Sequence, residues 1–270
     1  MAAKAVDIKK LLEAGAHFGH QTSRWHPGMA SYIHSKREGS HIIDLTKTVE
    51  ALETALDFLT KTASEGRQIL LVSTKRQAKD AVKAVAEATG MPYVTERWLG
   101  GMMTNQNTIG ARIRRLKDLE SRMATGELAA KYSKLEVQRM AEEIEGMNHL
   151  YGGIKDMNGQ PGAIFIVDVI TDDIPVREAR KLNIPVVALI DTNANPSMAE
   201  YPIPCNDDAI KTILLVLDYV QAAILAGKAK VKAPVQSKAK SAEEIKRAPV
   251  KDEKPVETPE PVAAPVRGIG

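Results

Sequence analysis

The sequence has one cysteine, few aromatic residues and no long apolar run. Because Cys205 is the only thiol, no disulfide can form within the chain, and we expect a reducing compartment, the cytoplasm. Aromatic residues make up 4% of the 270 residues, so the core must consist mainly of Ile, Leu, Val, Ala and Met. The apolar runs, such as 213–217, are far shorter than the roughly 20 residues of a transmembrane helix, so we expect no membrane span.

The net charge of +3 is unevenly distributed along the chain. Residues 228–270 hold ten Lys/Arg and six Asp/Glu, which gives this segment a charge of +4 and the rest of the chain −1. The segment also has six of the fourteen prolines and no aromatic residue, so it cannot bury enough apolar surface to offset its ordering entropy. We expect a disordered Lys/Ala/Pro/Glu-rich tail at 228–270, which either only solubilises the chain or contacts RNA weakly.

Short strands alternate with helices before this tail. The strand candidates lie at 41–44, 68–74, 91–95, 163–168 and 185–191, and the longer ones are apolar throughout, as in parallel sheets. Helical patterns cover 7–16, 46–63, 76–89, 175–182 and 207–226. This succession predicts an α/β fold, a flavodoxin-like (Rossmann-like) doubly wound parallel sheet of about five strands with helices on both faces.

The segment 104–151 interrupts the alternation, because it is long, polar and helical. Its apolar residues form two series with spacings of three and four, typical of coiled-coil seams: Ile109, Ile113, Leu116, Leu119 and Met123, then Val137, Met140, Ile144, Met147 and Tyr151. Gly126 lies in the break between the two series. We expect an antiparallel coiled-coil hairpin at 104–151, inserted into an α/β domain formed by 1–103 and 152–227.

The sequence lacks the motifs of a nucleotide-binding or catalytic α/β protein. It has neither a GxxxxGK[ST] phosphate loop nor a GxGxxG turn after a strand. Ser73 lacks the flanking glycines of a nucleophile elbow, and Cys205 has no His or Lys close to it in the chain. Asp168 and Asp191 end strands, where α/β enzymes place acid–base groups, but such residues more often cap a turn. These missing motifs argue against a nucleotide-binding site, and we expect no cofactor.

Five of the six histidines are clustered near the N-terminus, and a cluster of this kind can indicate a metal site. They are His17, His20, His26, His34 and His41. No cysteine pair accompanies them, and their spacings match no common zinc pattern, so we expect no metal. The alternative is an incidental site that joins one of these histidines to Asp191 or Asp207.

Two segments combine cations, flat rings and amide side chains. Segment 21–36 contains Trp25, and segment 96–107 contains Trp98 next to two glycines that permit close backbone approach. Arg and Lys contact phosphates and aromatic rings stack on unpaired bases, so both segments are candidate RNA-binding sites. The alternative for each tryptophan is packing against the core, and for the arginines of 112–115 it is a solvated helix face.

Seven short strings occur in order within residues 8–226. They are LLEAGAHFGHQT (11–22), HIIDL (41–45), RWLGGM (97–102), GGIKDM (152–157), IDTN (190–193), YPIP (201–204) and NDDAI (206–210). Each string is weak alone, but together they resemble the family of the second protein of the bacterial small (30S) ribosomal subunit. The chain departs from the family pattern at Cys205, where Gly is usual, at 194–195 and over 138–151.

The resemblance implies an α/β domain with a protruding coiled-coil hairpin and a structural, non-enzymatic role in the cytoplasmic small ribosomal subunit. It also implies binding to the small-subunit (16S-type) rRNA, neighbouring small-subunit proteins as partners, and docking of the large mRNA-binding first protein of that subunit. We expect no homo-oligomer.

Our hypothesis is therefore an rRNA-binding structural constituent of the small ribosomal subunit that acts in translation. The residues expected to contact rRNA are Arg24, Trp25, Lys36, Arg37, Lys75, Arg76, Arg97, Trp98, Asn105, Arg112, Arg114, Arg115 and Lys117. Two alternatives stay open at this point. One is an α/β enzyme or nucleotide-binding protein, and the other is a free regulatory RNA-binding or scaffold protein.

Overall fold

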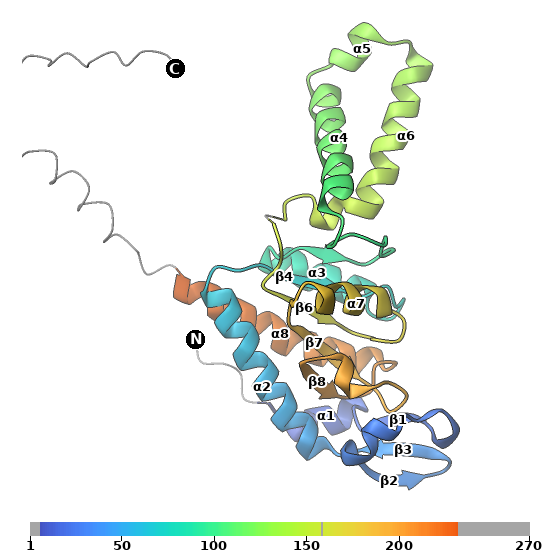
Figure 1. The fold of residues 1–270 in the computed structure, drawn as a ribbon, viewed down its shortest axis with the longest axis vertical. Coiled ribbons are helices and arrows are strands. Elements are labelled where there is room, and N and C mark those ends of the chain that lie inside the picture. The colour runs from blue at the N-terminus through green and yellow to red at the C-terminus, as the bar shows by residue number, and fades with distance from the viewer. Residues whose placement is uncertain (1–5, 158, 232–270) are drawn as a thin grey trace, which may run out of the picture. The chain divides into compact units, whose positions relative to one another are not determined.

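A five-stranded parallel sheet forms the centre of the chain in a computed structural model, which describes residues 6–157 and 159–231 (Figure 1). Its strand order is β5-β4-β6-β7-β8. The strands are β4 (Ile69–Val72), β5 (Tyr93–Val94), β6 (Ala163–Ile166), β7 (Val186–Ile190) and β8 (Tyr201–Pro204). The parallel, doubly wound α/β fold predicted from the apolar runs is thus confirmed.

Helices cover both faces of this sheet, because successive strand residues point to opposite faces. Leu71 of β4 packs with α1 (Ile8–Ala14), α2 (Leu45–Ser64), α3 (Lys79–Thr89) and α8 (Ile210–Val231). Its neighbours Leu70 and Val72 pack on the other face, with α7 (Asp173–Lys181) and the buried residues of α4 (Gln106–Ala124) and α6 (Lys134–Tyr151). The side chains of all four β4 residues are buried, as expected for an inner strand of a parallel sheet.

A second sheet of three antiparallel strands precedes the parallel one in the chain. It has the order β1-β3-β2 and consists of β1 (Phe18–Gln21), β2 (Ile33–Arg37) and β3 (Ser40–Ile43). Glu38 and Gly39 both have positive φ, which is the geometry of a two-residue hairpin turn between β2 and β3. The strand predicted at 41–44 belongs to this sheet, so counting it with the parallel sheet was wrong.

The fifth parallel strand is β8, a segment that the sequence did not reveal. Two prolines in Tyr201–Pro204 argue against an inner strand, because proline cannot donate to the ladder. The strand pairs only with β7 and lies at the edge of the sheet, which is the position where prolines are tolerated.

The segment 104–151 forms helices that run out and back (Figure 1). They are α4 (Gln106–Ala124), the short α5 (Glu127–Lys131) and α6 (Lys134–Tyr151). Gly126 adopts a φ of 74° in the break, a conformation that glycine reaches without strain. Leu116 and Leu119 of α4 are buried, but Val137 and Met140 of α6 are only half-buried. The helical hairpin is present, and a continuous coiled-coil seam is not confirmed.

The last helix, α8, extends beyond the residue at which we placed the tail. Residues 228–231 are helical, so the predicted start of the tail at 228 is wrong, and residues 232–270 lie outside the described part of the chain. Gly227 lets α8 pack closely against Thr60 and Ala63 of α2, and the Lys228 amine donates to the carbonyl of Thr89.

Helix α8 is also the one helix among residues 6–157 and 159–231 that is long and apolar enough to cross a membrane. More than half of that apolar stretch, 56%, is buried within the fold, chiefly against α2 and α3. Burial of this kind makes α8 a core helix. Short 3-10 turns complete the described structure: η1 (Thr22–Arg24), η2 (Pro27–Tyr32), η3 (Gly152–Ile154) and η4 (Pro196–Met198).

Candidate functional site

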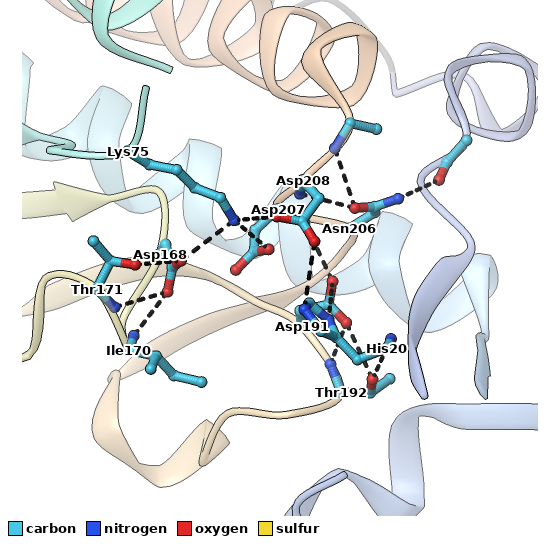
Figure 2. A network of polar contacts seen from close by, with 12 residues as sticks. His20, Lys75, Asp168, Ile170, Thr171, Asp191, Thr192, Asn206, Asp207 and Asp208 are labelled. Atoms are coloured by element: carbon cyan, nitrogen blue, oxygen red, sulfur yellow. Dashed lines mark hydrogen bonds and ion pairs between the residues drawn. The ribbon is translucent and has the colours of Figure 1, made fainter. Parts of the chain in front are cut away.

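Charged side chains converge where four parallel strands end, which is where α/β proteins usually bind ligands (Figure 2). Lys75, three residues after β4, places its ammonium Nζ 2.8 Å from Asp207 and 2.7 Å from Asp208, both beyond β8. The same Nζ lies 3.3 Å from Asp168, which follows β6. The ion pairs of Lys75 thus link the carboxyl ends of β4, β6 and β8.

The carboxylates of this network outnumber its cations, and the side chains of Lys75, Asp168 and Asp207 are largely buried. Burial and repulsion from Asp168 and Asp191 raise the pKa of Asp207 to about 7, against the attraction of Lys75. The carboxylates outweigh the burial of Lys75 and raise its pKa, so its ammonium stays charged. Asp168 also accepts the backbone N–H groups of Ile170 and Thr171, so it is a turn cap, as one of the alternatives for strand-end aspartates predicted.

His20 joins the same network from β1. Its Nδ1 lies 3.1 Å from Asp191 and its Nε2 3.4 Å from Asp208. The hydrogen bond with Asp191 raises the pKa of His20, although burial opposes it. A ligand atom of His20, one of Asp207 and one of Asp208 all lie within 4.8 Å of one another, a donor set that a divalent cation could use. Asp191 and Asp207, the two aspartates named for the alternative metal site, therefore both lie in the network of His20.

A second constellation is built around Glu178, a buried residue of α7. Its carboxylate accepts the indole N–H of Trp98 at 3.0 Å and the backbone N–H groups of Gly101 at 2.6 Å and Met103 at 3.0 Å. Thr104 donates both its backbone N–H and its hydroxyl, each at 3.1 Å. Burial alone would raise the pKa of Glu178, but these donors outweigh it and the pKa is lowered. Glu178 thus fixes the loop that leads into α4.

The two tryptophans have different surroundings. Trp98 is 7% exposed and packs in the core beside β4 and β6, as the packing alternative predicted. Trp25 is 36% exposed, and its ring centroid lies 5.3 Å from that of His41. Of the two rings, Trp25 is the more exposed and Trp98 is mainly a core residue.

The predicted cations also fall into two groups. Six are exposed and form no ion pair within residues 6–157 and 159–231: Arg24, Lys36, Arg76, Arg97, Arg112 and Arg114. Arg37 is exposed too, with only the equally exposed Glu38 at 3.7 Å. Lys75, Arg115 and Lys117 are paired, the last two with Glu143 at 2.8 Å and Asp156 at 2.9 Å. Asn105 is the N-cap of α4 and accepts from the Thr108 N–H at 3.3 Å.

Three of the exposed cations lie on the loop and helix that follow β5, and Arg24 lies elsewhere. Arg24 lines a pocket of about 400 Å³ together with His20, Asp191 and Asp208. Arg97 lies on the loop that Glu178 fixes, and Arg112 and Arg114 lie on α4 beyond it. Sequence reasoning missed Glu178 and Asp208. The doublet of aspartates at 207–208 was a visible signal, whereas nothing near Glu178 in the chain marks it.

Comparison with known proteins agrees with this arrangement. The family model described as ribosomal protein S2 matches residues 11–227. The chain belongs to the ribosomal protein S2 family. The small ribosomal subunit protein uS2 of Fusobacterium nucleatum is 47% identical over 222 residues, which are 82% of this chain and 90% of that protein. The uS2 proteins of Coprothermobacter proteolyticus and Roseiflexus sp. are each 46% identical, over 83% and 84% of this chain and 83% and 86% of theirs.

Membership of the ribosomal protein S2 family gives the chain a structural role in the small ribosomal subunit, in the bacterial cytoplasm, and not an enzymatic one. Burial and neighbouring carboxylates raise the pKa of the Cys205 thiol, which keeps it protonated and unreactive.

Proposed function

We propose that this ribosomal S2 protein binds small-subunit rRNA directly, through exposed cations of the loop at 97–105 and of α4. The observation that carries the proposal is that Arg97, Arg112 and Arg114 are exposed and unpaired among the described residues, while nearby Arg115 and Lys117 are used internally. Unpaired guanidinium groups bind phosphates without first breaking an ion pair, and they release counterions from the RNA. The global charge of +3 is too small to do this without such local concentration.

The Glu178 carboxylate supports this proposal by holding the RNA-binding loop in one shape. A loop that is ordered before binding loses less conformational entropy when it meets the RNA. On this reading the 104–151 insertion into the domain of 1–103 and 152–227 extends the RNA contact away from the sheet. The helical hairpin has a basic first arm for this purpose, with Arg112 and Arg114 on it.

Sedimentation of a tagged chain from a cytoplasmic extract at low and high salt tests the proposal. We expect the chain to comigrate with the small subunit at low salt and to be lost progressively at high salt, because phosphate contacts weaken as salt rises. A chain that sediments slowly at both salt concentrations, in an extract with intact ribosomes, contradicts the proposal. That result would favour a free regulatory RNA-binding protein instead.

We further propose that the large mRNA-binding first protein of the subunit docks on the α/β domain at the paired helices α1 and α8. Each helix exposes two apolar residues one turn apart: Ile8 and Leu12 of α1 are 44% and 54% exposed, and Ile210 and Leu214 of α8 are 55% and 48% exposed. The two helices pack together, with the Thr212 hydroxyl donating to the carbonyl of Ala14 at 2.9 Å. An apolar helical surface suits a protein partner better than it suits RNA.

Pull-down of the first protein with small subunits that carry Leu12→Glu and Ile210→Glu tests this docking surface. We expect the variant chain to remain in the subunit while the first protein is lost. The comparison is Leu225→Glu, which introduces the same charge at another exposed apolar position of α8. Retention of the first protein in the double variant contradicts the assignment. We propose one copy of the chain per subunit, with no homo-oligomer.

A further inference from the structure

A pocket of about 180 Å³ opens at the carboxyl end of the parallel sheet, beside the loop at 97–105 that Glu178 holds in place. Its walls come from Thr74 after β4, Arg97 and Trp98 after β5, and Thr171, Ile174 and Pro175 around the start of α7. Strand β4 has β5 on one side and β6 on the other, so the pocket lies at the point where the strand order reverses. Cofactor and drug-sized sites usually measure roughly 300–1,000 Å³, so this pocket suits one flat group and not a whole cofactor.

The walls of the pocket are held in place before any ligand arrives. Trp98 is fixed by its indole hydrogen bond to Glu178 at 3.0 Å. Thr74 donates its backbone N–H at 3.0 Å and its hydroxyl at 2.8 Å to the two oxygens of Asp172, which is 2% exposed. A pocket with such rigid walls binds without much loss of conformational entropy.

The chemistry of the mouth combines an apolar surface with unpaired positive charge. Ile174 is 48% exposed at the pocket. Arg97 is exposed and has no ion pair among residues 6–157 and 159–231, and exposed Arg76 lies two positions beyond Thr74. Two carboxylates line the pocket, and both already have partners: Glu96 pairs with Lys79 at 2.8 Å, and buried Asp172 accepts the backbone N–H and the hydroxyl of Thr74.

We propose that this pocket receives a single unpaired base of the rRNA, with Arg97 on the phosphate of that nucleotide. The inference rests on the proposed rRNA binding and adds a specific subsite to it. Ile174 and Pro175 would contact the face of the base, as apolar side chains do in single-stranded RNA recognition. The Thr171 hydroxyl donates to Asp168 at 2.8 Å, so its oxygen is left to accept a hydrogen bond from the base.

An RNA base fits these groups better than a side chain of a protein partner. An apolar protein side chain would fill the cavity but would leave Arg97 without an anion. A nucleotide supplies the flat group and the anion together. The protein side chain is therefore the competing outcome of the test.

Site-specific photocrosslinking in intact small subunits tests the inference. Benzoylphenylalanine replaces Ile174 in one chain and Leu225 of α8, which is 43% exposed, in a control chain. Subunits that contain each chain are purified and irradiated, and the crosslinked partner is identified by primer extension on the rRNA and by mass spectrometry. We expect position 174 to crosslink to one unpaired nucleotide that the control does not reach.

A crosslink from position 174 to protein alone, or no crosslink in subunits that contain the chain, overturns the inference. If the chain substituted at 174 does not enter subunits, the exposed Thr171 carries the crosslinker instead, under the same criteria. Absence of even the unsubstituted chain from subunits would be the failure of the proposed function, which the purification step detects separately. In a second measurement, Ile174→Glu should raise the dimethyl sulfate reactivity of that nucleotide about tenfold if it is an A or C, which corresponds to a loss of about 1.4 kcal/mol.

Discussion

The carboxylate of Glu178 accepts the indole N–H of Trp98 at 3.0 Å, although 80 positions of the chain separate the two residues. Four more donors from Gly101, Met103 and Thr104 reach the same carboxylate. The loop therefore takes its shape from α7, across the face of the parallel sheet, and not from its own sequence. A single carboxylate links the core of the α/β fold to the start of the helical hairpin.

Replacing this carboxylate by an amide should loosen the loop. In Glu178→Gln the amide NH2 group faces backbone N–H donors, so at least one donor loses its acceptor, and we expect the free energy of unfolding to fall by about 2 kcal/mol at pH 7. Urea unfolding followed by tryptophan fluorescence measures this loss. Glu87→Gln, at an exposed position of α3, should leave the midpoint unchanged.

The same pair of proteins gives a pH test. The pKa of Glu178 is lowered in the folded state, so its contribution is present above the ordinary pKa of a glutamate and is lost as the pH falls through the folded value. The wild-type chain should therefore lose part of its advantage over Glu178→Gln between neutral pH and pH values below about 4. A constant difference between the two proteins over this range would show that the charge of Glu178 is unimportant.

Lys75 should matter more for stability than any exposed lysine. Its removal in Lys75→Ala leaves Asp168, Asp207 and Asp208 close together without a cation, and breaking one partner of a buried ion pair costs about 3–5 kcal/mol. Calorimetric unfolding at pH 8 should show this loss. The control is Lys79→Ala, whose partly exposed pair with Glu96 should contribute roughly 0–1 kcal/mol.

The loss in Lys75→Ala should shrink as the pH falls from 8 to 5. Without the lysine, repulsion from the neighbouring carboxylates raises the folded pKa of Asp207 further, and a group with a raised pKa stabilises the fold at low pH, where it is protonated. Equal losses at pH 8 and pH 5 would mean that Lys75 acts through packing and not through its charge.

The parts of the fold that the sequence predicted are those with local signals. Ile69–Val72 and Ala163–Ile166 are apolar on both faces, and this pattern is sufficient to recognise inner parallel strands. Tyr201–Pro204 was missed because its prolines are compatible only with an edge, and a sequence does not say which strand will be at the edge. The antiparallel sheet was missed because β2 is mostly exposed and carries no apolar alternation.

The sequence predicted which residue types could contact RNA, but not which of those residues are exposed. Arg97, Arg112 and Arg114 are exposed and unpaired among the described residues, as an RNA contact requires. From the sequence, Lys75 and Trp98 are equally good candidates for an RNA contact. Their side chains instead bind Asp207 and Glu178, which lie 132 and 80 positions away. Pairing over such distances is set by the tertiary fold, so composition and spacing do not distinguish these internal residues from surface ones.

Charge reversal on α4 should weaken rRNA binding without unfolding the chain. Arg112 and Arg114 lie on different sides of α4, since positions two apart do not share a helix face. In Arg112→Glu with Arg114→Glu we expect subunit incorporation to fall at least about tenfold at moderate salt, with a shallower salt dependence. Sedimentation over a salt series measures both effects.

The control for this experiment is an exchange of charges that keeps an internal ion pair. Arg115→Glu with Glu143→Arg preserves the pair between α4 and α6 and the net charge, so incorporation should stay near the wild-type level. The two single variants then show which flank of α4 faces the RNA. Normal incorporation of the double variant of Arg112 and Arg114 would remove α4 from the RNA contact.

Two glycine-to-alanine changes should have opposite effects on stability. A Cβ at Gly227 of α8 would lie 2.5 Å from the carbonyl oxygen of Thr60 and 2.7 Å from the Cβ of Ala63, so α8 and α2 would have to move apart. We expect Gly227→Ala to lower the free energy of unfolding by about 1–3 kcal/mol, as overpacking in a core does. Gly146 of α6 has nothing within 4 Å of its added Cβ, so Gly146→Ala should instead stabilise the helix by about 0.5–1 kcal/mol. Thermal unfolding of the two variants in parallel measures both signs, and a stabilising Gly227→Ala would contradict the close packing of α8 on α2.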